Sequence, residues 1–344
     1  MISLSALTLT EIEELLPALP RFRAAQIFKW IAKGVNSFEE MTNIPASLRN
    51  ELSSEFSLYS TKVDSVHEDG ETKKFVFSLE DGAKIESVLL NDGKKRLTAC
   101  LSSQAGCPAG CVFCKTGSLG FKRNLSCAEI IEQFLHLRLA SQGKNSGHII
   151  DNIVVMGMGE PLLNLPNLRK AIMLLNSKKG INFSPRRITI STCGICEGLC
   201  ELAQNGPYVR LALSLTTADE TLRRKLMPIT KSNPLENVKE NLLLFQKKSG
   251  GRITLEIPLL GQVNTREADA ESIAEFAKGL DSIINIIPWN PVAGFEFEGK
   301  PLCEPEKKET EDFIRKLEGY GLKVTMRLHK GRSVMGACGQ LGVI

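Results

Sequence analysis

The chain has 344 residues, of which 42% are hydrophobic and ten are cysteines, and its formal net charge is +4. A chain of this length can bury a core without disulfide support, so the cysteines indicate metal binding or thiol chemistry rather than a disulfide-stapled secreted domain. The N-terminus lacks a basic leader and no run of ~18 apolar residues occurs, so we expect a cytoplasmic protein with no membrane span.

Residues 1–55 predict a small helical domain. Within 21–34, apolar side chains recur at helical spacing at Ala25, Ile27, Phe28 and Ile31. Residues 37–56 follow with serine and proline punctuation, which is typical of short helices. We expect an accessory domain here.

Residues 56–96 predict a short β lead-in to the rest of the chain. Apolar and polar residues alternate through 73–90 on both sides of Asp81-Gly82. An Asp-Gly pair between two alternating segments is a strong signal for a β-hairpin. The lead-in is therefore expected to contain two strands joined at this turn.

Residues 97–344 alternate between short apolar strands and helical stretches. Such alternation predicts a parallel sheet, and the number of units predicts a partial (βα)6 barrel similar to a TIM barrel. Ser126 and Glu129 form the sequence pattern of a helix N-terminal capping box. The expected strands lie in 97–103, 151–161, 186–194, 208–216, 251–260, 282–290 and 322–328.

The first of these strands is followed by CPAGCVFC, which contains Cys107, Cys111 and Cys114. Reactive groups in βα barrels lie at the C-terminal ends of the strands, where this turn falls. A zinc site would need a fourth ligand, for which the candidates are Cys127, His136 and Cys100. A four-iron cluster held by three thiolates instead leaves one iron open for a small molecule. A second trio after the third strand, Cys193, Cys196 and Cys200, is a further candidate, and its competing interpretation is a set of buried apolar thiols.

The C-x3-C-x2-C spacing after the first strand of a barrel resembles the signature of the radical S-adenosylmethionine (SAM) superfamily. The resemblance implies one [4Fe–4S] cluster on Cys107, Cys111 and Cys114, whose open iron chelates SAM. It also implies that electron transfer from the cluster cleaves SAM to a 5′-deoxyadenosyl radical. The segment MGMGEP, with Gly159 and Glu160, then resembles the superfamily's site for the SAM amine.

Further motifs resemble the radical SAM adenine methyltransferases of the RlmN/Cfr family. They are CLSSQAGCPAGCVFCKTGSLGFKRNL, VVMGMGEPLLN, RRITISTCG, LMPIT, NIIPWNP and ACGQL, in that order over residues 20–342. The resemblance implies methylation of C2 of an adenosine in 23S rRNA and in tRNA. The alternative is the C8 methyltransferase of the antibiotic-resistance branch.

The family resemblance also implies a relay of three side chains. Cys338 would accept a methyl group as S-methylcysteine from one SAM, and a second SAM would supply the radical, so two are used per turnover. Cys100 would resolve the enzyme–RNA adduct by forming a transient disulfide with Cys338. Glu86 would be the proton acceptor.

The same resemblance implies a set of SAM contacts. Thr216 stands where relatives commonly have histidine, so its SAM contact is expected either to differ from theirs or to come from the backbone alone. The implied residues are Gly159, Glu160, Ser191, Ser214, Leu215, Thr216 and Asn290.

The expected partners are RNA and a reductant such as flavodoxin or ferredoxin, and the chain is expected to be a monomer. RNA recognition needs cations for phosphates and flat side chains for splayed bases. Each candidate has solvated surface charge as its competing interpretation. The candidates are Arg21, Arg23, Lys29, Trp30, Lys122 and Arg123.

Overall fold

The computed structural model describes residues 1–344 except 71, 92–95, 142–149, 328–330 and 343–344. A ten-stranded sheet passes through most of the molecule, in the order β16-β13-β12-β11-β10-β9-β6-β5-β4-β3. Its strands are β3 (Lys62–Asp69), β4 (Thr72–Ser78), β5 (Lys84–Asn91), β6 (Leu97–Cys100), β9 (Ile150–Val155), β10 (Ile188–Thr192), β11 (Arg210–Ser214), β12 (Ile253–Leu259), β13 (Ser282–Pro288) and β16 (Val324–Met326).

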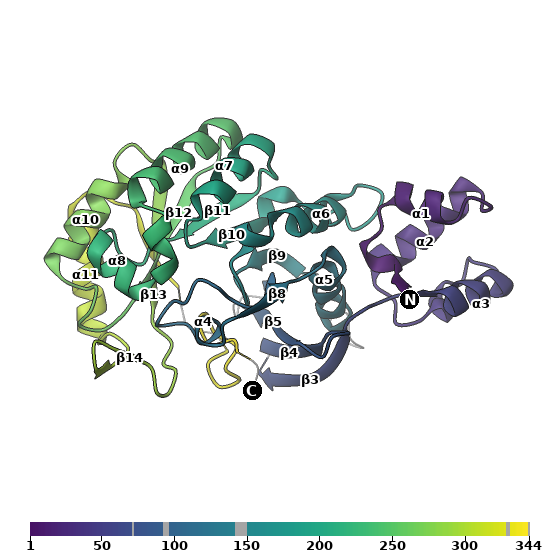
Figure 1. The fold of residues 1–344 in the computed structure, drawn as a ribbon, viewed down its shortest axis with the longest axis horizontal. Helices are drawn as coiled ribbons and strands as arrows, with labels where there is room; N and C mark the ends of the chain where they lie inside the picture. Colours follow the sequence, from purple (N-terminus) through teal and green to yellow (C-terminus); the bar gives the residue numbers. More distant parts are fainter. Residues whose placement is uncertain (71, 92–95, 142–149, 328–330, 343–344) are drawn as a thin grey trace.

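All neighbouring strands from β6 to β16 pair in parallel, which confirms the predicted parallel sheet. Leu328, at the end of the last expected strand, lies outside the described residues. Helices connect the strands and cover the outer face of a partial barrel (Figure 1). They are α5 (Cys127–Ser141), α6 (Leu165–Asn176), α7 (Cys196–Asn205), α8 (Glu220–Leu226), α9 (Leu235–Ser249), α10 (Glu267–Ala277) and α11 (Lys307–Gly319).

The predicted hairpin is correct, but it belongs to the main sheet. Gly82 adopts φ +79°, a conformation that glycine tolerates, and the Ala83 amide donates to Asp81 Oδ1 at 3.0 Å. β5 then pairs antiparallel with β6, so the hairpin continues the sheet beyond the edge of its parallel strands. The sequence analysis did not predict β3, which pairs with β4 at the far edge. The division at residues 55 and 96 stays a prediction.

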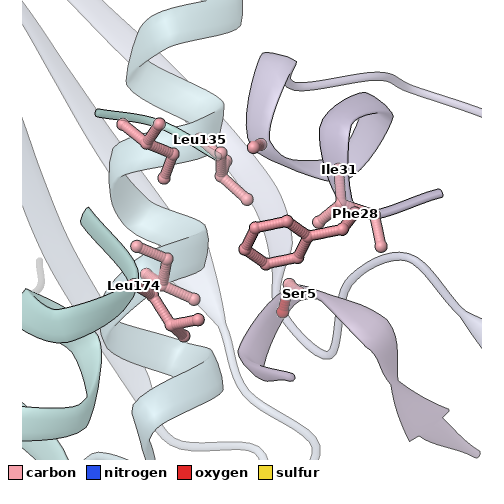
Figure 2. A pocket seen from close by; sticks show the side chains of 8 residues that line it. Ser5, Phe28, Ile31, Leu135 and Leu174 are labelled. Carbon is pink, nitrogen blue, oxygen red and sulfur yellow. The ribbon is translucent and has the colours of Figure 1, made fainter. Parts of the chain in front are cut away.

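The N-terminal helices lie at one end of the molecule, beside α5 and α6 (Figure 1). They are α1 (Leu9–Leu15), α2 (Arg21–Lys33) and α3 (Ala46–Glu55), and β1 (Ile2–Ser3) pairs with β2 (Phe56–Ser57) nearby. Phe28 of α2 projects between Leu135 of α5 and Leu174 of α6 (Figure 2). The buried stripe of α2 contains Ala24, whereas the predicted Ala25 is only half-buried. Burial of this stripe attaches the helices to the outside of the barrel.

The predicted capping box at the start of α5 is confirmed. Ser126 Oγ accepts from the Glu129 amide at 3.2 Å, and Glu129 Oε2 accepts from the Ser126 amide at 2.8 Å. The three-cysteine turn lies between β7 (Gln104–Gly106) and α4 (Lys115–Ser118), and β7 pairs antiparallel with β8 (Phe121–Asn124).

The remaining short elements are connectors. β14 (Glu296–Phe297) and β15 (Lys300–Pro301) form a small antiparallel pair. Short 3₁₀ helices span Leu4–Ala6, Phe38–Glu40, Pro161–Asn164, Pro185–Arg187 and Pro228–Ser232. Within the described part of the chain, every helix is too short or too polar to cross a bilayer.

Candidate active site at the carboxyl ends of the strands

The three-cysteine turn is closed by glycines. Gly106 has φ +77°, and a Cβ there would collide with the Gly120 carbonyl oxygen. A Cβ on Gly117 would lie 2.9 Å from the backbone nitrogen and oxygen of Cys111. The Cys107 amide donates to Gly120 O at 2.9 Å and fixes the entry to the turn. Glycine is therefore required for the backbone to bring the three thiols together.

The three thiols hold their protons strongly when no metal is bound. Burial raises the pKa of Cys107 to about 12 and raises the pKa values of Cys111 and Cys114 as well. For Cys111 the next causes are the neighbouring thiols of Cys114 and Cys107, whose negative charge disfavours a further thiolate. Bound iron would lower the pKa values of all three thiols, since a cation stabilises several thiolates at once. The donor set fits an iron–sulfur cluster.

Of the three candidate fourth zinc ligands, Cys127 and His136 have other surroundings, whereas Cys100 influences Cys338, as Cys114 of the turn does. Cys127 on α5 is close to Lys170 and Glu11, and His136 packs against Tyr59 with ring centroids 4.5 Å apart. Among the residues that the structure describes, no three His, Cys, Asp or Glu side chains form a site for a single metal ion. Cys193 is buried and Cys196 and Cys200 are half-buried, and both interpretations of this second trio stay predictions.

Glu160 is a buried carboxylate held by backbone donors. Its oxygens accept from the Cys193 amide at 2.8 Å and the Leu162 amide at 3.0 Å. Gly159 has φ +103°, and a Cβ there would lie 2.5 Å from Gln104 Cβ. Burial is the largest influence on Glu160 and raises its pKa, while the backbone donors oppose that shift. An ammonium group beside the carboxylate would stabilise its charged form.

Ser191 and Ser214 meet at the ends of β10 and β11. Their Oγ atoms are 3.2 Å apart, and Ser191 Oγ donates to Glu256 Oε2 of β12 at 2.6 Å. Leu215 and Thr216 continue from Ser214, and both amides donate to the Glu256 carbonyl oxygen. These three adjacent strand ends thus bring hydroxyl and carboxylate groups together.

Thr216 is strained and has an unsatisfied hydroxyl. Its φ is +64°, which is rare for a β-branched residue, and it is fully buried. In the described structure its Oγ1 has no hydrogen-bond partner. A buried unsatisfied polar atom costs about 1–3 kcal/mol, so this position fits a site completed by a polar ligand.

The C-terminal segment docks on the cysteine turn (Figure 1). The Lys115 amide donates to Gly339 O at 2.8 Å, and Thr116 Oγ1 donates to Leu341 O at 2.5 Å. Asn290 does not present a free amide, because its Nδ2 donates to Cys338 O at 3.0 Å. These contacts place Cys338 at the mouth of the barrel beside the proposed cluster ligands.

Cys338 and Cys100 lie in the same electrostatic environment. Burial raises the pKa of Cys338 to about 12 and that of Cys100 to about 11. Arg327 lowers both pKa values, whereas Glu256 raises them. Cys338 is exposed as a residue, although burial around its thiol is the largest cause of the raised pKa. All ten cysteines are free, so the disulfide implied by the family resemblance is not supported by this structure.

Glu86 faces the same interior as Cys100 because of strand register. Val88 lies opposite Cys100 on β6 and opposite Lys74 on β4, and Glu86 is two residues away on the same face of β5. Lys74 Nζ is 3.0 Å from Glu86 Oε1, and both side chains are buried. The Gly342 amide donates to Glu86 Oε2 at 2.7 Å, so Glu86 also holds the C-terminal segment.

Sequence reasoning missed Lys74, Glu256 and Arg327. A signal was present for two of them, since Lys74 and Glu256 are charged residues within apolar strand segments. A charged side chain inside a strand of a parallel or central sheet must find a partner or a ligand. Arg327 gave no such signal because it follows the last strand of the sheet.

The candidate RNA-binding side chains divide into two groups. Arg123 is engaged with Glu129 at 2.8 Å and with Asp81 at 2.6 Å. Arg23 Nη1 donates to the Asn43 carbonyl oxygen, and Trp30 Nε1 donates to Asn43 Oδ1. The others, Arg21, Lys29 and Lys122, are exposed. A role in RNA binding stays a prediction for all six.

Two family models match the chain. Residues 101–277 match the radical SAM superfamily, and residues 2–58 match the ribosomal RNA large subunit methyltransferase N-terminal domain. The second match covers the N-terminal helices that pack on α5 and α6. Glu86, Cys100 and Cys338 lie outside both matched ranges.

Relatives are similar over nearly the whole chain. The probable dual-specificity RNA methyltransferase RlmN of Treponema denticola is 52% identical over 341 residues, covering 99% of this chain and 95% of that protein. A protein of the same name from Thermus thermophilus is 42% identical, covering 97% of this chain and 94% of that protein. A crystal structure of a radical SAM methyltransferase from Sphaerobacter thermophilus superposes with a TM-score of 0.92 at 34% identity, covering 99% of each chain.

Proposed function

Because the chain belongs to the radical SAM superfamily and, within it, to the RlmN family of RNA methyltransferases, we propose that it methylates C2 of an adenosine. The proposed substrates are 23S rRNA and tRNA, in keeping with the dual specificity in the names of its relatives. The observation that carries the proposal is the docking of Cys338 beside the three-cysteine turn. A thiol at that place is suited to carry a methyl group to a carbon that lacks a lone pair.

We assign one [4Fe–4S] cluster to Cys107, Cys111 and Cys114. When bound, the cluster supplies the electron that cleaves SAM to a 5′-deoxyadenosyl radical. Glu160 is suited to bind the SAM ammonium, since its carboxylate is buried and fixed by two backbone donors. Ser191, Ser214 and the backbone at Thr216 would hold the remaining polar groups of SAM.

Cys338 and Cys100 then have different roles in the covalent steps. Cys338 Sγ accepts the methyl group of one SAM and becomes S-methylcysteine, and S-adenosylhomocysteine leaves. A 5′-deoxyadenosyl radical would remove one hydrogen atom from this methyl group, and the resulting carbon radical would add to adenine C2. The adduct would then give up one electron, for which the oxidised cluster would be the acceptor, and Glu86 would remove the C2 proton. Cys100 Sγ attacks Cys338 Sγ, so that a disulfide forms while the electron pair of the broken carbon–sulfur bond stays on the methylene carbon, which takes up a proton to become the methyl group; external thiols later reduce the disulfide. The shared influence of Arg327 and Glu256 on both thiols supports this pairing.

The proposed reaction requires an electron donor and access of the adenine base to Cys338. A one-electron donor of low potential, such as flavodoxin or ferredoxin, must supply the cluster. We place the enzyme in the cytoplasm as a monomer. The adenine must leave its stack to reach Cys338 at the barrel mouth, since base chemistry inside a helix is sterically blocked.

The test is expression in a host that lacks its own methyltransferase, followed by nucleoside mass spectrometry with standards for both adenosine isomers. We expect 2-methyladenosine in 23S rRNA and in tRNA. The Cys338→Ala variant should abolish the product, because the methyl-carrying thiol is gone. Cys303→Ala, at an exposed cysteine outside the site, is the matched control. A C8-methylated product from the wild type would overturn the proposed regiochemistry.

A further inference from the structure

One wall of the three-cysteine turn is formed by α8 and the 3₁₀ turn that follows it. The Val112 amide donates to Leu226 O at 3.0 Å, and the Ile229 amide donates to Ala109 O at 3.4 Å. A Cβ on Gly110 would contact Pro228 Cγ at 3.8 Å. The backbone of residues 109–112 is thus held against the segment 226–229, so a side chain on the inner face of α8 lies close to the turn.

Arg223 is that side chain. It is 0% exposed, and among the described residues it is the largest side chain that is fully buried. Its Nε donates to Leu215 O at 3.1 Å, and its Nη2 donates to Cys193 O at 2.6 Å. These two carbonyl oxygens fix the plane of the guanidinium. Nη1 is buried and, in the described part of the structure, has no hydrogen-bond partner.

The positive charge of Arg223 lacks a direct counter-ion within the part of the chain that the structure describes. Among the described residues no carboxylate forms an ion pair with it, and Glu220 acts on it only at longer range. Burial lowers the pKa of Arg223, and the groups whose negative charge would oppose this shift include Cys193, Glu220 and Cys111. A buried charge without a partner is costly, so the interior at this place is suited to an anion.

We propose that Arg223 is a positioning residue for the iron–sulfur cluster, which its guanidinium binds at the side of Cys111 and whose reduction potential it raises. The inference rests on the cluster ligation assigned under the proposed function. Three thiolates outweigh the charge of the oxidised cluster core, and reduction adds a further negative charge. A fixed buried cation therefore stabilises the reduced form more than the oxidised form, as do hydrogen bonds to cluster sulfur.

The experiment compares Arg223→Gln with wild type and with Arg224→Gln. Arg224 is the next residue of α8, but its side chain is half exposed and faces Glu220, so it is a matched control for loss of one positive charge. Each protein is reconstituted anaerobically with iron and sulfide, and iron content is measured. The midpoint potential is then determined from the electron paramagnetic resonance signal of the reduced cluster during titration with dithionite and mediators.

For Arg223→Gln we expect retained cluster with a more negative midpoint. The ratio of reduced to oxidised cluster at the wild-type midpoint should fall by at least about tenfold, which is about 59 mV for a one-electron couple. The midpoint of Arg224→Gln should equal that of wild type. An unchanged midpoint in Arg223→Gln would overturn the inference, and so would an equal shift in both variants.

A second variant decides the matter if Arg223→Gln does not fold. Arg223→Met removes the positive charge and leaves an unbranched apolar side chain, which is less costly to bury than an unpaired polar group. It should bind the cluster with a midpoint more negative than that of wild type. A wild-type midpoint in this variant contradicts the inference. The ligation is tested separately by Cys111→Ala, which should lose the cluster; full retention there would overturn both the ligation and the role of Arg223.

Discussion

At the scale of single residues, the two thiols at the barrel mouth are held in their neutral form. A thiolate is the nucleophile in both of the steps proposed for them. Burial raises the pKa of Cys338 to about 12 and of Cys100 to about 11, while Arg327 acts in the opposite direction on both. Arg327 is therefore the described cation that promotes thiolate formation at both positions.

Replacing Arg327 with glutamine should slow the methylation of Cys338 by SAM. Without the positive charge of Arg327, the pKa of the Cys338 thiol rises. The fraction of Cys338 present as thiolate then falls at every pH below that pKa. Intact-protein mass spectrometry of Cys338 methylation over time measures the rate. Lys323→Gln, at an exposed lysine just before β16, is the control and should methylate at the wild-type rate. Equal rates in all three proteins would contradict the assignment.

Replacing Cys100 with alanine should trap a covalent protein–RNA adduct. The adduct needs a thiol to attack Cys338 Sγ, and Cys100 is the thiol whose charge acts on Cys338 from β6. Denaturing gel electrophoresis after anaerobic turnover with labelled RNA would reveal a shifted band that nuclease removes. The Cys303→Ala control should release methylated RNA. Normal turnover by Cys100→Ala would show that another group resolves the adduct.

At the scale of elements, strand register determines which side chains share the interior. The antiparallel pairing of β5 with β6 sets Val88 opposite Cys100 and leaves Glu86 on the same face. A shift of one residue would turn Glu86 to the other face. The parallel neighbours β10, β11 and β12 likewise align Ser191, Ser214 and Glu256. Strand pairing thus places Glu86, Cys100 and the candidate SAM-binding serines, whereas Cys338 is placed by the docking of the C-terminal segment on the cysteine turn.

His136 on α5 makes the fold sensitive to acid. Burial against Tyr59 and Phe77 lowers its pKa from 6.5 to about 4, because the charged imidazolium is disfavoured there. A group with a lowered pKa in the folded state contributes stability above its unfolded pKa, and that stability is lost as the pH falls toward the folded value. The loss between these two values amounts to at most about 3 kcal/mol.

We therefore expect His136→Leu to weaken the pH dependence of the unfolding free energy between pH 6.5 and about pH 4. Urea unfolding at several pH values, followed by circular dichroism, measures this slope. His67→Leu, at an exposed histidine on β3, is the control and should keep the wild-type slope. A slope in His136→Leu as steep as that of wild type would show that other groups cause the acid sensitivity.

At the scale of the whole molecule, Glu132 joins three distant parts of the chain. This carboxylate on α5 is fully buried, and it accepts from Ser5 Oγ at 2.6 Å and from the Thr61 amide at 2.7 Å. It also accepts from Ser3 Oγ at 2.8 Å and from the Ser60 amide at 2.9 Å. These bonds tie the N-terminus and the start of β3 to the barrel, beside the apolar contact of Phe28.

Glu132→Gln should therefore destabilise the junction. Glutamine replaces one accepting carboxylate oxygen with an NH2 group, which is a donor and faces groups that are donors themselves. At least one buried hydrogen bond is therefore lost, which lowers the free energy of unfolding by about 3 kcal/mol. The free energy of unfolding in urea measures the effect, and limited proteolysis reports whether residues 1–55 become accessible. Glu51→Gln, at an exposed position of α3, should equal wild type. An unchanged unfolding free energy in Glu132→Gln would contradict this role.

Local signals in the sequence were sufficient for the Asp81-Gly82 turn, the α5 capping box and the parallel strands of the main sheet, because each depends on neighbouring residues. These strands are β6, β9, β10, β11, β12, β13 and β16. The short strands β7, β8, β14 and β15 were not predicted. The same signals did not predict β3 or the continuity of β5 with β6. Strand pairing joins residues that are distant in the sequence. Alternation of apolar and polar residues predicts a strand, but it does not predict which strand lies beside it. Charged residues such as Lys74 and Arg223 were missed as well, since their partners lie on other elements.

The spacing of three thiols on a glycine-bearing turn and the alternation of strands with helices could be recognised from the chain alone, because both are patterns of neighbouring residues. The role expected for Cys338 came instead from the resemblance to a known family. Three others became visible in the folded molecule, namely that Cys338 meets the turn, that Glu86 and Cys100 share one face, and that Arg223 is buried with an Nη1 that has no hydrogen-bond partner among the described residues. They escape sequence reasoning because burial and strand pairing bring together residues that no local pattern connects.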